Sequence, residues 1–569
     1  MKILGICNTS DAGATLLIDG AVVASVNEER FSRIKNQRAF PAQAINYCLT
    51  SQGLDIAQID YVVCGAWGGV DEQYLATVIA ELLAAVVKNP AAQQVINDRT
   101  RVALERDGFF RRELREEVIN LGVPAEKIAF YDHHLSHAYT AFYPSPFEEA
   151  LVCTSDARGD FKSATISKAS RQAGIELLDS TSMYHSLGFF YAFITRYLGF
   201  TPNKHEGKIT GLAAFGNPEA CLPVLRRMIG YQDEKTVANL GTCYMPFLSA
   251  TLPEIERELA RYSKADVAAG AQHLLEQTTS AYLQKYLQLT GLRQVCLAGG
   301  VFSNVKLNQR ILALPEVDNI YVFPQMGDGG NAFGGALIKL YELGGTFNAP
   351  LHHVFLGPAF SRPEILHTLA AYQEQVTYCA VQEYTLQRVA QEIAAGGIIG
   401  LFTGRMEYGP RALGGRSIMA RAIDHDVTAI LNKRLNRSEF MPFAPVTLED
   451  YAGQYYVGWQ KAQLASRFMT VCYECTDRAK RQTPGIVHVD QTARPQIINA
   501  ADNALYYGIL KAYHDLTGIP TLINTSFNNH EEPIVCSPKD AIESLLLDNV
   551  DYVVLEEFIV KRNRMSQIA

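Results

Sequence analysis

The sequence predicts an α/β fold whose first half contains a duplicated unit. The chain opens with three short apolar strands at 2–7, 14–19 and 21–29, which form a meander. A similar phrase returns near residue 150, where Cys-Thr-Ser-Asp at 153–156 echoes Cys-Asn-Thr-Ser-Asp at 7–11. An Ala-Thr pair follows each Asp and helix-like segments follow each meander, so we interpret the pattern as an internal duplication.

Two further segments extend this first domain. Residues 294–312 and 319–342 each predict a strand, a Gly-rich turn and a helix. Such turns present backbone N–H groups and a helix N-terminus at the end of a strand, where polar or anionic parts of a nucleotide can bind. Gly and Pro then become frequent, which predicts a first domain at 1–350, a linker at 351–380 and a second domain at 381–569.

The second domain is expected to contain a mixed sheet with helices. Its predicted strands are 397–404, 441–448, 467–475, 520–528 and 552–560, and its predicted helices are 386–396, 428–436, 503–518 and 538–549. Cys472 and Cys475 have zinc or redox spacing, but they lie in a strand-like run without a second pair. Buried strand thiols are therefore the favoured interpretation.

The composition is that of an ordinary globular protein. In 569 residues, 51 Lys and Arg oppose 59 Asp and Glu, and 48% of the residues are hydrophobic. This excludes a disordered chain, a collagen and a coiled-coil rod, and the net charge of −8 gives no basic signature for nucleic acid or an anionic membrane. With no long apolar run, no leader-like N-terminus and scattered cysteines, we expect a soluble, cytoplasmic protein.

One short motif predicts a metal site. His133 and His137 are four residues apart, so in a helix their rings share one face. Asp156, at the end of a predicted strand, and Asp328, in a Gly-rich turn, can add two carboxylates. Two imidazoles and two carboxylates suit Fe(II), Mn(II) or Zn(II). The alternatives are packed helix histidines and, for Asp328, a helix N-cap.

In the second domain, arginines predict an anion site. Arg405, Arg411, Arg416 and Arg421 lie in one span with several glycines and Pro410, which interrupt a helix. A guanidinium fork on such a turn suits phosphate or carboxylate. Further polar signals are Lys433, Arg437, Arg494 and the run Asn524-Thr525-Ser526-Phe527-Asn528. That run either faces a ligand at a strand end or forms a turn.

Two resemblances follow from these motifs. The duplicated meander, with an Asp at the first hairpin of each half, resembles the actin-like ATPase superfamily. The whole chain resembles the NodU/CmcH family of O-carbamoyltransferases. The motifs that carry this second resemblance are ILGICNTSDAGATLLIDG, EERFSRIKNQRAFP, DHHLSHA, HSLGFFYAFIT, HEGKITGLAAFG, LAGGVFSN, PQMGDGG, GRMEYGPRALGGRSI, FMPFAPV, HVDQTARPQ and PTLINTSFNNHEEPIV, which cover nearly all of it.

This resemblance implies a two-step reaction. A C-terminal domain similar to YrdC-type synthases joins carbamoyl phosphate and ATP, with Mg²⁺, into carbamoyl-adenylate with loss of pyrophosphate. An N-terminal actin-like domain then transfers the carbamoyl group to a hydroxyl of a small polyhydroxylated acceptor, at an iron-type metal site. The implied donor, cofactors and acceptor are thus carbamoyl phosphate, ATP with Mg²⁺, Fe(II) or a similar ion, and a small molecule.

The resemblance also assigns roles by position. The implied metal ligands are His133, His137, Asp156 and Asp328. The implied adenosine-binding turns contain Gly299, Gly300, Val301, Asn304 and Gly327, and the transferase cleft is lined by Glu206 and Lys208. Around carbamoyl phosphate and ATP the matching positions are Arg411, Arg416, Ser417, Lys433, Arg437, Arg494, Asn524 and Ser526. Positive charge is required there because two anionic substrates must meet.

Two departures from the family pattern affect these assignments. Many relatives carry His-Asp in the first hairpin where this chain has Ser10-Asp11, so Asp11 is the expected group to orient or deprotonate the acceptor. The common Arg-Glu-x-Phe-Arg-Pro-Phe-Ala-Pro becomes Arg-Ser-Glu-Phe-Met-Pro-Phe-Ala-Pro at 437–445, which alters the predicted carbamoyl phosphate site.

Other functions remain open at this point. A tRNA threonylcarbamoyl-type transferase would want a basic face, which the net charge does not favour. Hydrogenase-maturation carbamoyl enzymes carry an acylphosphatase region and paired Cys-x-x-Cys motifs, both missing from this sequence. A non-catalytic, actin-like nucleotide-binding regulator would need neither the arginines nor the metal ligands. Residues 66–125 are predicted to be helical and either wall the acceptor pocket or form a homodimer interface.

Overall fold

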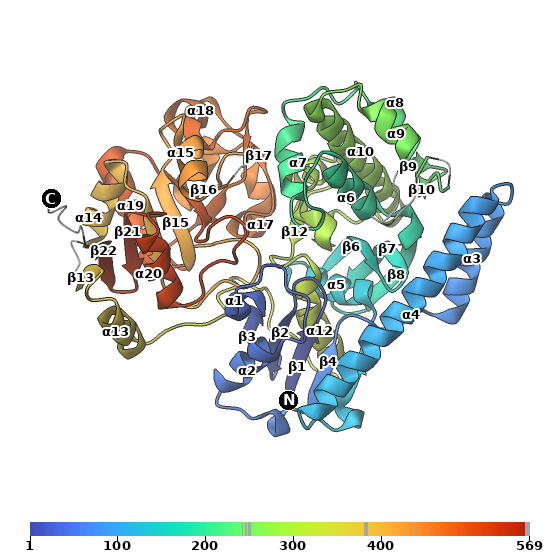
Figure 1. Ribbon diagram of the computed structural model, residues 1–569, viewed down its shortest axis with the longest axis horizontal. Coiled ribbons are helices and arrows are strands. Elements are labelled where there is room, and N and C mark those ends of the chain that lie inside the picture. Colours follow the sequence, from blue (N-terminus) through green and yellow to red (C-terminus); the bar gives the residue numbers. More distant parts are fainter. Residues whose placement is uncertain (242, 245–246, 248–251, 381–384, 438–439, 564–569) are drawn as a thin grey trace. The chain divides into compact units, whose positions relative to one another are not determined.

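A computed structural model describes residues 1–569 except 242, 245–246, 248–251, 381–384, 438–439 and 564–569 (Figure 1). Ser438 and Glu439, in the altered family motif, therefore lie outside the described residues. The chain forms two compact units. Unit 1 comprises Met1–Glu28 and Asn36–Leu351, and unit 2 comprises Glu29–Lys35 and His352–Ala569.

Unit 1 contains two five-stranded sheets with the same topology. The first has the order β3-β2-β1-β4-β5 and the second the order β8-β7-β6-β11-β12. In each, a three-stranded antiparallel meander is followed by two strands that run parallel to its first strand. The strands are β1 (Lys2–Cys7), β2 (Gly13–Ile18), β3 (Ala21–Asn27), β4 (Tyr61–Cys64), β5 (Ile128–Phe130), β6 (Glu149–Gly159), β7 (Lys162–Ser170), β8 (Gly174–Ser182), β11 (Gln294–Ala298) and β12 (Asn319–Val322). This repetition is what an internal duplication produces.

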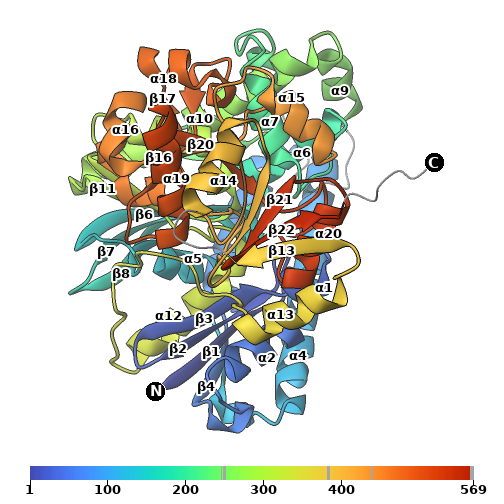
Figure 2. The ribbon, with the colours of Figure 1, turned by 90° about the vertical axis from the view of Figure 1, so that its left-hand side faces the viewer.

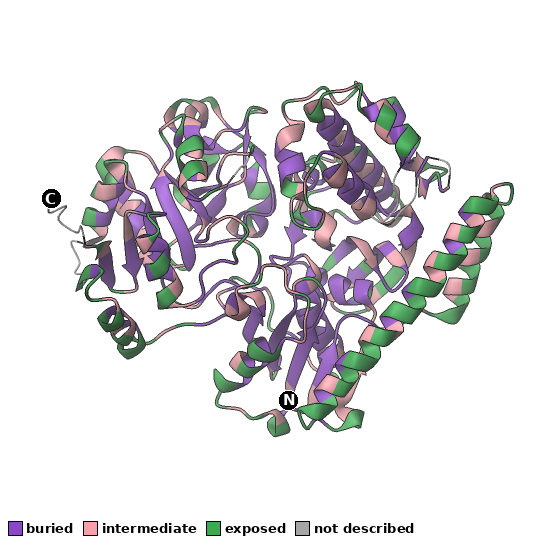
Figure 3. Cartoon of the chain, viewed as in Figure 1, coloured by how far each residue is buried: buried purple, intermediate pink, exposed green. Residues whose placement is uncertain are grey.

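Helices connect and accompany these sheets. They are α2 (Ala42–Thr50), α3 (Glu72–Ala85), α4 (Pro90–Asn120), α5 (His133–Phe142), α6 (Leu187–Tyr197), α7 (Glu206–Ala213), α8 (Leu222–Arg226), α9 (Pro253–Leu259), α10 (Lys264–Thr290), α11 (Val305–Leu312) and α12 (Asn331–Glu342), with a hairpin of β9 (Ile229–Gln232) and β10 (Lys235–Ala238). The sheets are mostly buried, whereas α3 and α4 are largely exposed (Figure 3). The buried residues of α4 recur at alternating intervals of four and seven, which gives it one inward stripe.

A close approach of α12 places the end of the second sheet beside α5. A Cβ added to Gly334 of α12 would lie 2.2 Å from the carbonyl oxygen of Ser136 on α5. A Cβ added to Gly5 of β1 would lie 1.8 Å from the carbonyl oxygen of Ala332 on α12. Only glycine fits at either position, because real Cβ atoms do not approach backbone so closely. The turn before α12 is thereby held opposite the N-terminal half of α5.

Unit 2 contains an eight-stranded sheet (Figure 2), which is mixed, as predicted. Its order is β13-β22-β21-β14-β15-β20-β16-β19, in which β14–β21 and β16–β19 are parallel and the other pairs antiparallel. The strands are β13 (Val376–Ala380), β14 (Ile399–Phe402), β15 (Arg416–Arg421), β16 (Pro445–Leu448), β19 (Gln496–Ile498), β20 (Thr521–Ser526), β21 (Tyr552–Leu555) and β22 (Phe558–Arg562). Val389, Ile393, Tyr506 and Leu510, from α14 (Thr385–Ala394) and α19 (Ala504–Thr517), join its hydrophobic core.

Three details of unit 2 differ from the expected elements. The predicted strand 552–560 is a hairpin, because Glu556 turns the chain at a φ of 49°. Of the predicted strand 467–475, only Tyr473–Glu474 forms a strand, β17, which pairs with β18 (Thr492–Ala493), while Cys475 forms an isolated bridge with Tyr456. The predicted linker 351–380 contains α13 (Arg362–Ala371) and β13, and all but its first residue belong to unit 2.

A short N-terminal segment also belongs to unit 2. It contains α1 (Glu29–Ser32), and the buried Arg30 donates to the carbonyl oxygen of Gly409 at 2.7 Å. Arg33 donates to the carbonyl oxygens of Ile534 and Pro533 at 2.7 and 2.8 Å. Because these carbonyls are satisfied from so far away in sequence, residues 29–35 are an integral part of unit 2.

Two further expectations concern cysteines and membrane spans. None of the eleven cysteines, all of which are described, forms a disulfide, and Cys472 and Cys475 are buried, as predicted. Within the described part of the chain, the helices are too short or too polar to traverse a lipid bilayer.

Candidate functional site

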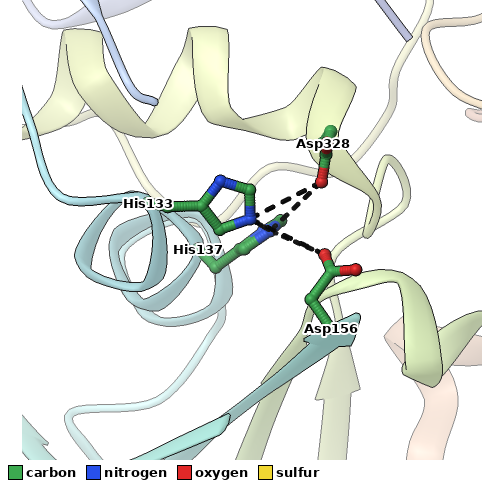
Figure 4. Close-up of side chains that lie close together, drawn as sticks. All are labelled: His133, His137, Asp156 and Asp328. Carbon is green, nitrogen blue, oxygen red and sulfur yellow. Dashed lines mark hydrogen bonds and ion pairs between the residues drawn. The ribbon is translucent and has the colours of Figure 1, made fainter. Parts of the chain in front are cut away.

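The four predicted metal ligands converge in unit 1 (Figure 4). His133 and His137 come from α5, Asp156 from β6, and Asp328 from the short 3₁₀ turn Asp328–Gly330 before α12. His137 Nε2 lies 3.3 Å from Asp156 Oδ2 and 4.0 Å from Asp328 Oδ1. The corresponding distances from His133 Nε2 are 3.7 and 3.5 Å, and the two Nε2 atoms are 3.2 Å apart.

Local interactions explain why the histidines share one face. Asp132 caps α5, because its carboxylate accepts the N–H of Leu135 at 2.8 Å. Lys162 holds the other oxygen of Asp132 at 2.6 Å. The His133 ring packs against Gly159, where an added Cβ would lie 2.2 Å from the imidazole. The predicted helix is therefore confirmed, and it begins where the histidine pair begins.

The Gly299-Gly300 turn supports Asp156 directly. The N–H of Gly300 donates to Asp156 Oδ2 at 3.2 Å. Gly299 has a φ of 104°, and a Cβ there would lie 2.1 Å from the carbonyl oxygen of Ser155. This turn thus requires glycine because it lies directly on the strand that carries Asp156.

Burial and proximity shift the proton affinities of the cluster. Burial opposes charge on His133, but Asp328 and Asp156 outweigh it and raise the pKa of His133 to about 9. Burial lowers the pKa of His137. Although burial alone would raise the pKa of Asp156, hydrogen bonds from both histidines hold that pKa well below its usual range. Burial and the neighbouring Asp156 raise the pKa of Asp328.

The donor set fits a divalent transition metal. One ligand atom from each of the four side chains lies within 4.8 Å of all the others. Ligand atoms about 2.1 Å from one ion are themselves separated by about 3 to 4 Å, the range of the distances found in the cluster. Two imidazole nitrogens and two carboxylate oxygens suit Fe(II), Mn(II) or Zn(II).

Sequence reasoning missed Asn331, which contacts both histidines. Its buried Nδ2 lies 3.3 Å from His133 Nδ1 and 3.4 Å from His137 Nε2, while its Oδ1 has no hydrogen-bond partner among the described residues. With the amide turned over, Oδ1 would accept the N–H at His133 Nδ1 and leave Nε2 as a ligand atom. Its place directly after the Asp-Gly-Gly turn was the only available signal.

His134, which lies between the two candidate ligands in the sequence, makes a structural hydrogen bond instead. Its Nδ1 lies 2.7 Å from Thr154 Oγ1, which in turn lies 2.6 Å from Thr165 Oγ1. Burial and the positive charge of His133 lower the pKa of His134 to about 3, so the ring stays neutral.

Asp11 lies beside the cluster, in the turn between β1 and β2. Its Oδ1 accepts from Asn36 Nδ2 at 2.8 Å and its carbonyl oxygen from Asn27 Nδ2 at 3.0 Å. A Cβ on Gly327 would lie 3.3 Å from Asp11 Oδ2, so this carboxylate borders the turn that carries Asp328. Asp11 has a φ of 126°, an unusual conformation that fixes the direction of its side chain.

Three other predicted residues of unit 1 lie on α7 and in the turn before α11. Lys208 is buried on α7, with Nζ 5.9 Å from the centre of the Phe200 ring. Asn304 caps α11 by accepting the N–H of Leu307 at 3.1 Å, and it donates to Gln272 of α10 at 2.8 Å. Val301 is half-buried in the same turn. Their contact with a nucleotide stays a prediction.

In unit 2, the structure separates the arginines that the sequence grouped. Arg416 is fully buried, and its guanidinium donates to the carbonyl oxygens of Thr403, Gly404, Gly415 and Pro358 at 2.8 to 3.2 Å. Its Nη1 and Nη2 groups are thus engaged within the protein. Arg405 likewise donates to the carbonyl oxygens of Leu356 and Gly357. Arg421 donates to the Asp424 carboxylate and to the carbonyl oxygen of Ala394.

The Gly-rich turn of unit 2 contains its own anion. The buried carboxylate of Glu407 accepts the backbone N–H groups of Leu413, Gly415 and Arg416 at 2.7 to 3.0 Å. Amides arranged in this way commonly form a nest for a bound anion. The Glu407 side chain occupies this one, a contact that sequence reasoning missed.

The other predicted residues of unit 2 gather around β15, β20 and β19. Arg437 donates to Ser526 Oγ at 3.1 Å and to Asn528 Oδ1 at 2.7 Å. Ser526 pairs with Ser417 across the sheet, and Asn524 donates to the carbonyl oxygen of Ala412, the residue after Arg411, at 3.0 Å. Arg494 lies between β18 and β19, and Lys433 is exposed on α15 (Val427–Arg434).

Comparison with known proteins identifies relatives over the whole length. The family model "Carbamoyltransferase N-terminus" matches residues 2–337, and "Carbamoyltransferase C-terminus" matches residues 390–562. The nodulation protein NolNO of Sinorhizobium fredii is 32% identical over 98% of this chain and 79% of that protein. An uncharacterized protein of Synechocystis is 32% identical over 98% of this chain and 96% of that protein.

Solved structures give a weaker likeness. Full-length HypF in its phosphate- and nucleotide-bound form overlaps 60% of this chain and 47% of that chain, with 14% identity and a TM-score of 0.32. The family models and the two relatives match a larger part of the sequence than these structures do. With two family models matched in order and a relative 32% identical over nearly all of its own length, the chain belongs to the carbamoyltransferase family of enzymes.

Proposed function

We propose that this protein is an ATP-dependent O-carbamoyltransferase that acts on a hydroxyl of a small molecule. The observation that carries the proposal is the convergence of His133, His137, Asp156 and Asp328 in unit 1 of a chain from this family. We further propose that unit 1 is actin-like, which its two equivalent sheets support, and that unit 2 is YrdC-like. Neither nucleic acid nor a membrane is needed for this activity.

The first step is proposed for unit 2. Carbamoyl phosphate, ATP and water give carbamoyl-adenylate, pyrophosphate and phosphate, so that atoms balance. Arg437, Lys433, Arg411 and Arg494 are proposed to hold the anionic groups, with Mg²⁺ accompanying ATP. Arg437 is fixed by Ser526 and Asn528, which supports a positioned rather than a freely moving guanidinium. Arg416 and Ser417 are proposed to shape the turn, because Ser417 Oγ accepts the N–H of Gly414 at 2.9 Å.

The second step is proposed for unit 1. The acceptor oxygen forms a bond to the carbamoyl carbon, the bond from that carbon to the AMP oxygen breaks, and Asp11 takes the hydroxyl proton. The Gly299-Gly300 turn with Asn304, and the turn at Gly327, are proposed to bind the adenosine part, with Lys208 lining the same cleft. A divalent cation such as Fe(II), held by the four clustered side chains, would supply Lewis-acid stabilisation of charge on the departing phosphate.

Pyrophosphate release tests the first step. The full-length enzyme with ATP and Mg²⁺ should release pyrophosphate only when carbamoyl phosphate is added. Release that is independent of carbamoyl phosphate would refute the proposed first step.

His137→Ala tests the division between the units. It removes one ring from the cluster, so bound metal and carbamoyl transfer should fall to background while carbamoyl-dependent pyrophosphate release persists. His273→Ala, on α10 of the same unit, is the matched control and should retain both activities. Loss of both steps, or of neither, in His137→Ala would contradict the assignment of transfer to unit 1. Radiolabelled carbamoyl phosphate and a panel of hydroxylated metabolites provide the transfer assay.

A further inference from the structure

Three arginines of unit 1 surround a single carboxylate near the candidate metal centre. Asp107 lies in the inward stripe of α4, and one of its oxygens forms a close ion pair with Arg158 of β6. Arg106 Nε lies 3.9 Å from the same oxygen. Arg38, which precedes α2, interacts electrostatically with both Arg158 and Asp107. Two guanidinium groups therefore pair with the Asp107 carboxylate, and a third lies within electrostatic reach of it.

An aromatic pair holds the third arginine in place. The guanidinium carbon of Arg38 lies 4.0 Å from the centre of the Phe110 ring and 5.5 Å from that of Trp67. These two rings stack with centroids 5.4 Å apart at 28°. The Arg38 side chain is exposed, and within the described residues its N–H groups have no hydrogen-bond acceptor. Cation–π contact orients this guanidinium but leaves its donors available.

The patch is fixed relative to the metal ligands. Arg158 follows Asp156 by two residues on β6. The backbone N–H groups of Gly68 and Gly69, next to Trp67, donate to the Asp160 carboxylate, which also accepts the N–H of His133 at 2.9 Å. Arg38 in turn interacts with Asp328. A ligand group on these arginines would thus lie next to the place where the reaction is proposed to occur.

An excess of guanidinium groups over carboxylates distinguishes this patch from a solvated surface: three arginines face Asp107 and Asp328. Burial, then repulsion from Arg158, lowers the pKa of Arg106 to about 10. Only 10% of the Arg158 side chain is exposed, so water compensates its charge poorly, whereas Arg106 is 47% exposed and open to a ligand. An ordinary exposed arginine on the same helix, Arg101, is 63% exposed and pairs with Glu105. An oxyanion would supply the missing negative charge.

We propose that Arg38, Arg106 and Arg158 bind an oxyanion carried by the acceptor, so that the acceptor is a hydroxylated acid, a carboxylate or a phosphate ester. This inference rests on the proposed function, because it assigns the acceptor to the same reaction. Trp67 and Phe110 form the platform against which Arg38 meets the ligand. Arg158 positions the patch beside Asp156.

Intrinsic fluorescence tests binding without turnover. The chain has two tryptophans, Trp67 and Trp459, and only Trp67 touches the patch. Glucuronate and inorganic phosphate, titrated into the full-length protein without ATP or carbamoyl phosphate, should each give a saturable change that Trp67→Phe abolishes. Glucose, which is neutral, should give none. If glucuronate alone binds, the anion is a carboxylate, and if phosphate alone binds, it is a phosphate.

Substitutions then test the arginines. Arg38→Ala and Arg106→Ala should each weaken the bound probe about 10- to 100-fold, as expected for loss of a charge-assisted hydrogen bond. Arg101→Ala is the matched control and should leave affinity unchanged. Equal affinity in the Arg38 and Arg106 variants, binding of glucose as strong as that of glucuronate, or no saturable change with either anion would overturn the proposal.

A competition experiment separates this inference from the proposed function. If AMP displaces the probe, the patch serves the nucleotide and the assignment to the acceptor is wrong. If the probes bind as expected but carbamoyl-dependent pyrophosphate release is absent, the proposed function fails while the anion site stands. In the transfer assay, acidic acceptors should be carbamoylated in preference to their neutral analogues, and Arg38→Ala should raise KM for them more than it lowers kcat.

Discussion

Buried charged side chains have different partners in the two units. In unit 1, two imidazoles and two carboxylates face one another across a few ångströms, and their ligand atoms point to a common centre. In unit 2, Arg416 is equally buried but donates to four backbone carbonyls, and Glu407 accepts three backbone amides. In the sequence, the two sites look alike, because both have charged residues close to glycines. What distinguishes a ligand site from a scaffold is whether the charged atoms are already engaged by the chain itself.

The largest effect is expected from Asp156→Asn. Its Oδ2 faces both Nε2 atoms, so loss of the carboxylate removes one ligand and the charge that stabilises the histidines. Metal affinity should fall by more than about 100-fold, with transfer lost and pyrophosphate release kept. Bound metal per chain, measured by elemental analysis, is the readout. Asp318→Asn, at an exposed ion pair with Arg293, is the control. A variant that keeps metal and transfer would remove the contrast between the units.

Arg416→Met should lower the stability of the protein without changing metal binding in unit 1. Methionine has a similar reach but cannot donate to the carbonyl oxygens of Thr403, Gly404, Gly415 and Pro358, and the loss of these hydrogen bonds should cost about 3 to 5 kcal/mol. Urea denaturation is the measurement. Lys433→Met, on an exposed helix position, should change stability by less than about 0.5 kcal/mol. If Arg416→Met keeps its stability and raises KM for carbamoyl phosphate, Arg416 contacts the substrate instead.

A smaller effect is expected at Asn331, which contacts the two histidines that are candidate ligands. Asn331→Ala removes the amide beside His133 and His137 and should weaken metal binding about 10- to 100-fold. Equilibrium titration with Fe(II) or Zn(II) gives the affinity, and the urea midpoint shows that the protein stays folded. Unchanged affinity would mean that Asn331 fills space only.

The smallest effect concerns His185, a half-buried histidine away from the cluster. Burial, with the positive charge of Lys235, lowers the pKa of His185 to about 4, below its ordinary value of 6.5. The unfolded chain therefore takes up the proton first as pH falls, and stability is lost below pH 6.5. The loss between pH 6.5 and 5.5 should be about 1 kcal/mol. In His185→Asn, whose oxygen can still accept the N–H of Ala238, this pH dependence should disappear. Urea midpoints across this range provide the comparison.

Features set by neighbours in sequence could be predicted. The α5 helix, its cap at Asp132 and the shared face of His133 and His137 follow from spacing and capping alone. The strand meanders were also predicted, because alternation and turn residues mark them locally. Asp156 joined the predicted site as the end of a predicted strand and Asp328 as part of a Gly-rich turn, and the fold brings both there, although β6 continues past Asp156 to Gly159.

Features set by distant backbone could not be predicted. Arg416 was predicted to bind an anion, because the neighbouring sequence does not indicate that its guanidinium donates to the carbonyl oxygens of Pro358 and Thr403. Glu407 had no motif to mark it, since its partners are amides of a later turn. Arg30 and Arg33 lay in a family motif, yet their carbonyl partners are about 380 and 500 residues away. Such partners depend on tertiary packing, which leaves no local pattern.

The seven residues Glu29–Lys35 have a consequence for how this protein is made and cut. Because they belong to unit 2, the chain passes between the units three times. During synthesis, this first piece of unit 2 follows only 28 residues of unit 1. Arg33 can bind its acceptor carbonyls only after Pro533 and Ile534 have been synthesised. After a single proteolytic cut near Leu351, the N-terminal fragment would still supply residues 29–35 to unit 2. A fragment that starts at His352 would lack these residues, so the carbonyl oxygens of Gly409 and Ile534 would lose their arginine donors.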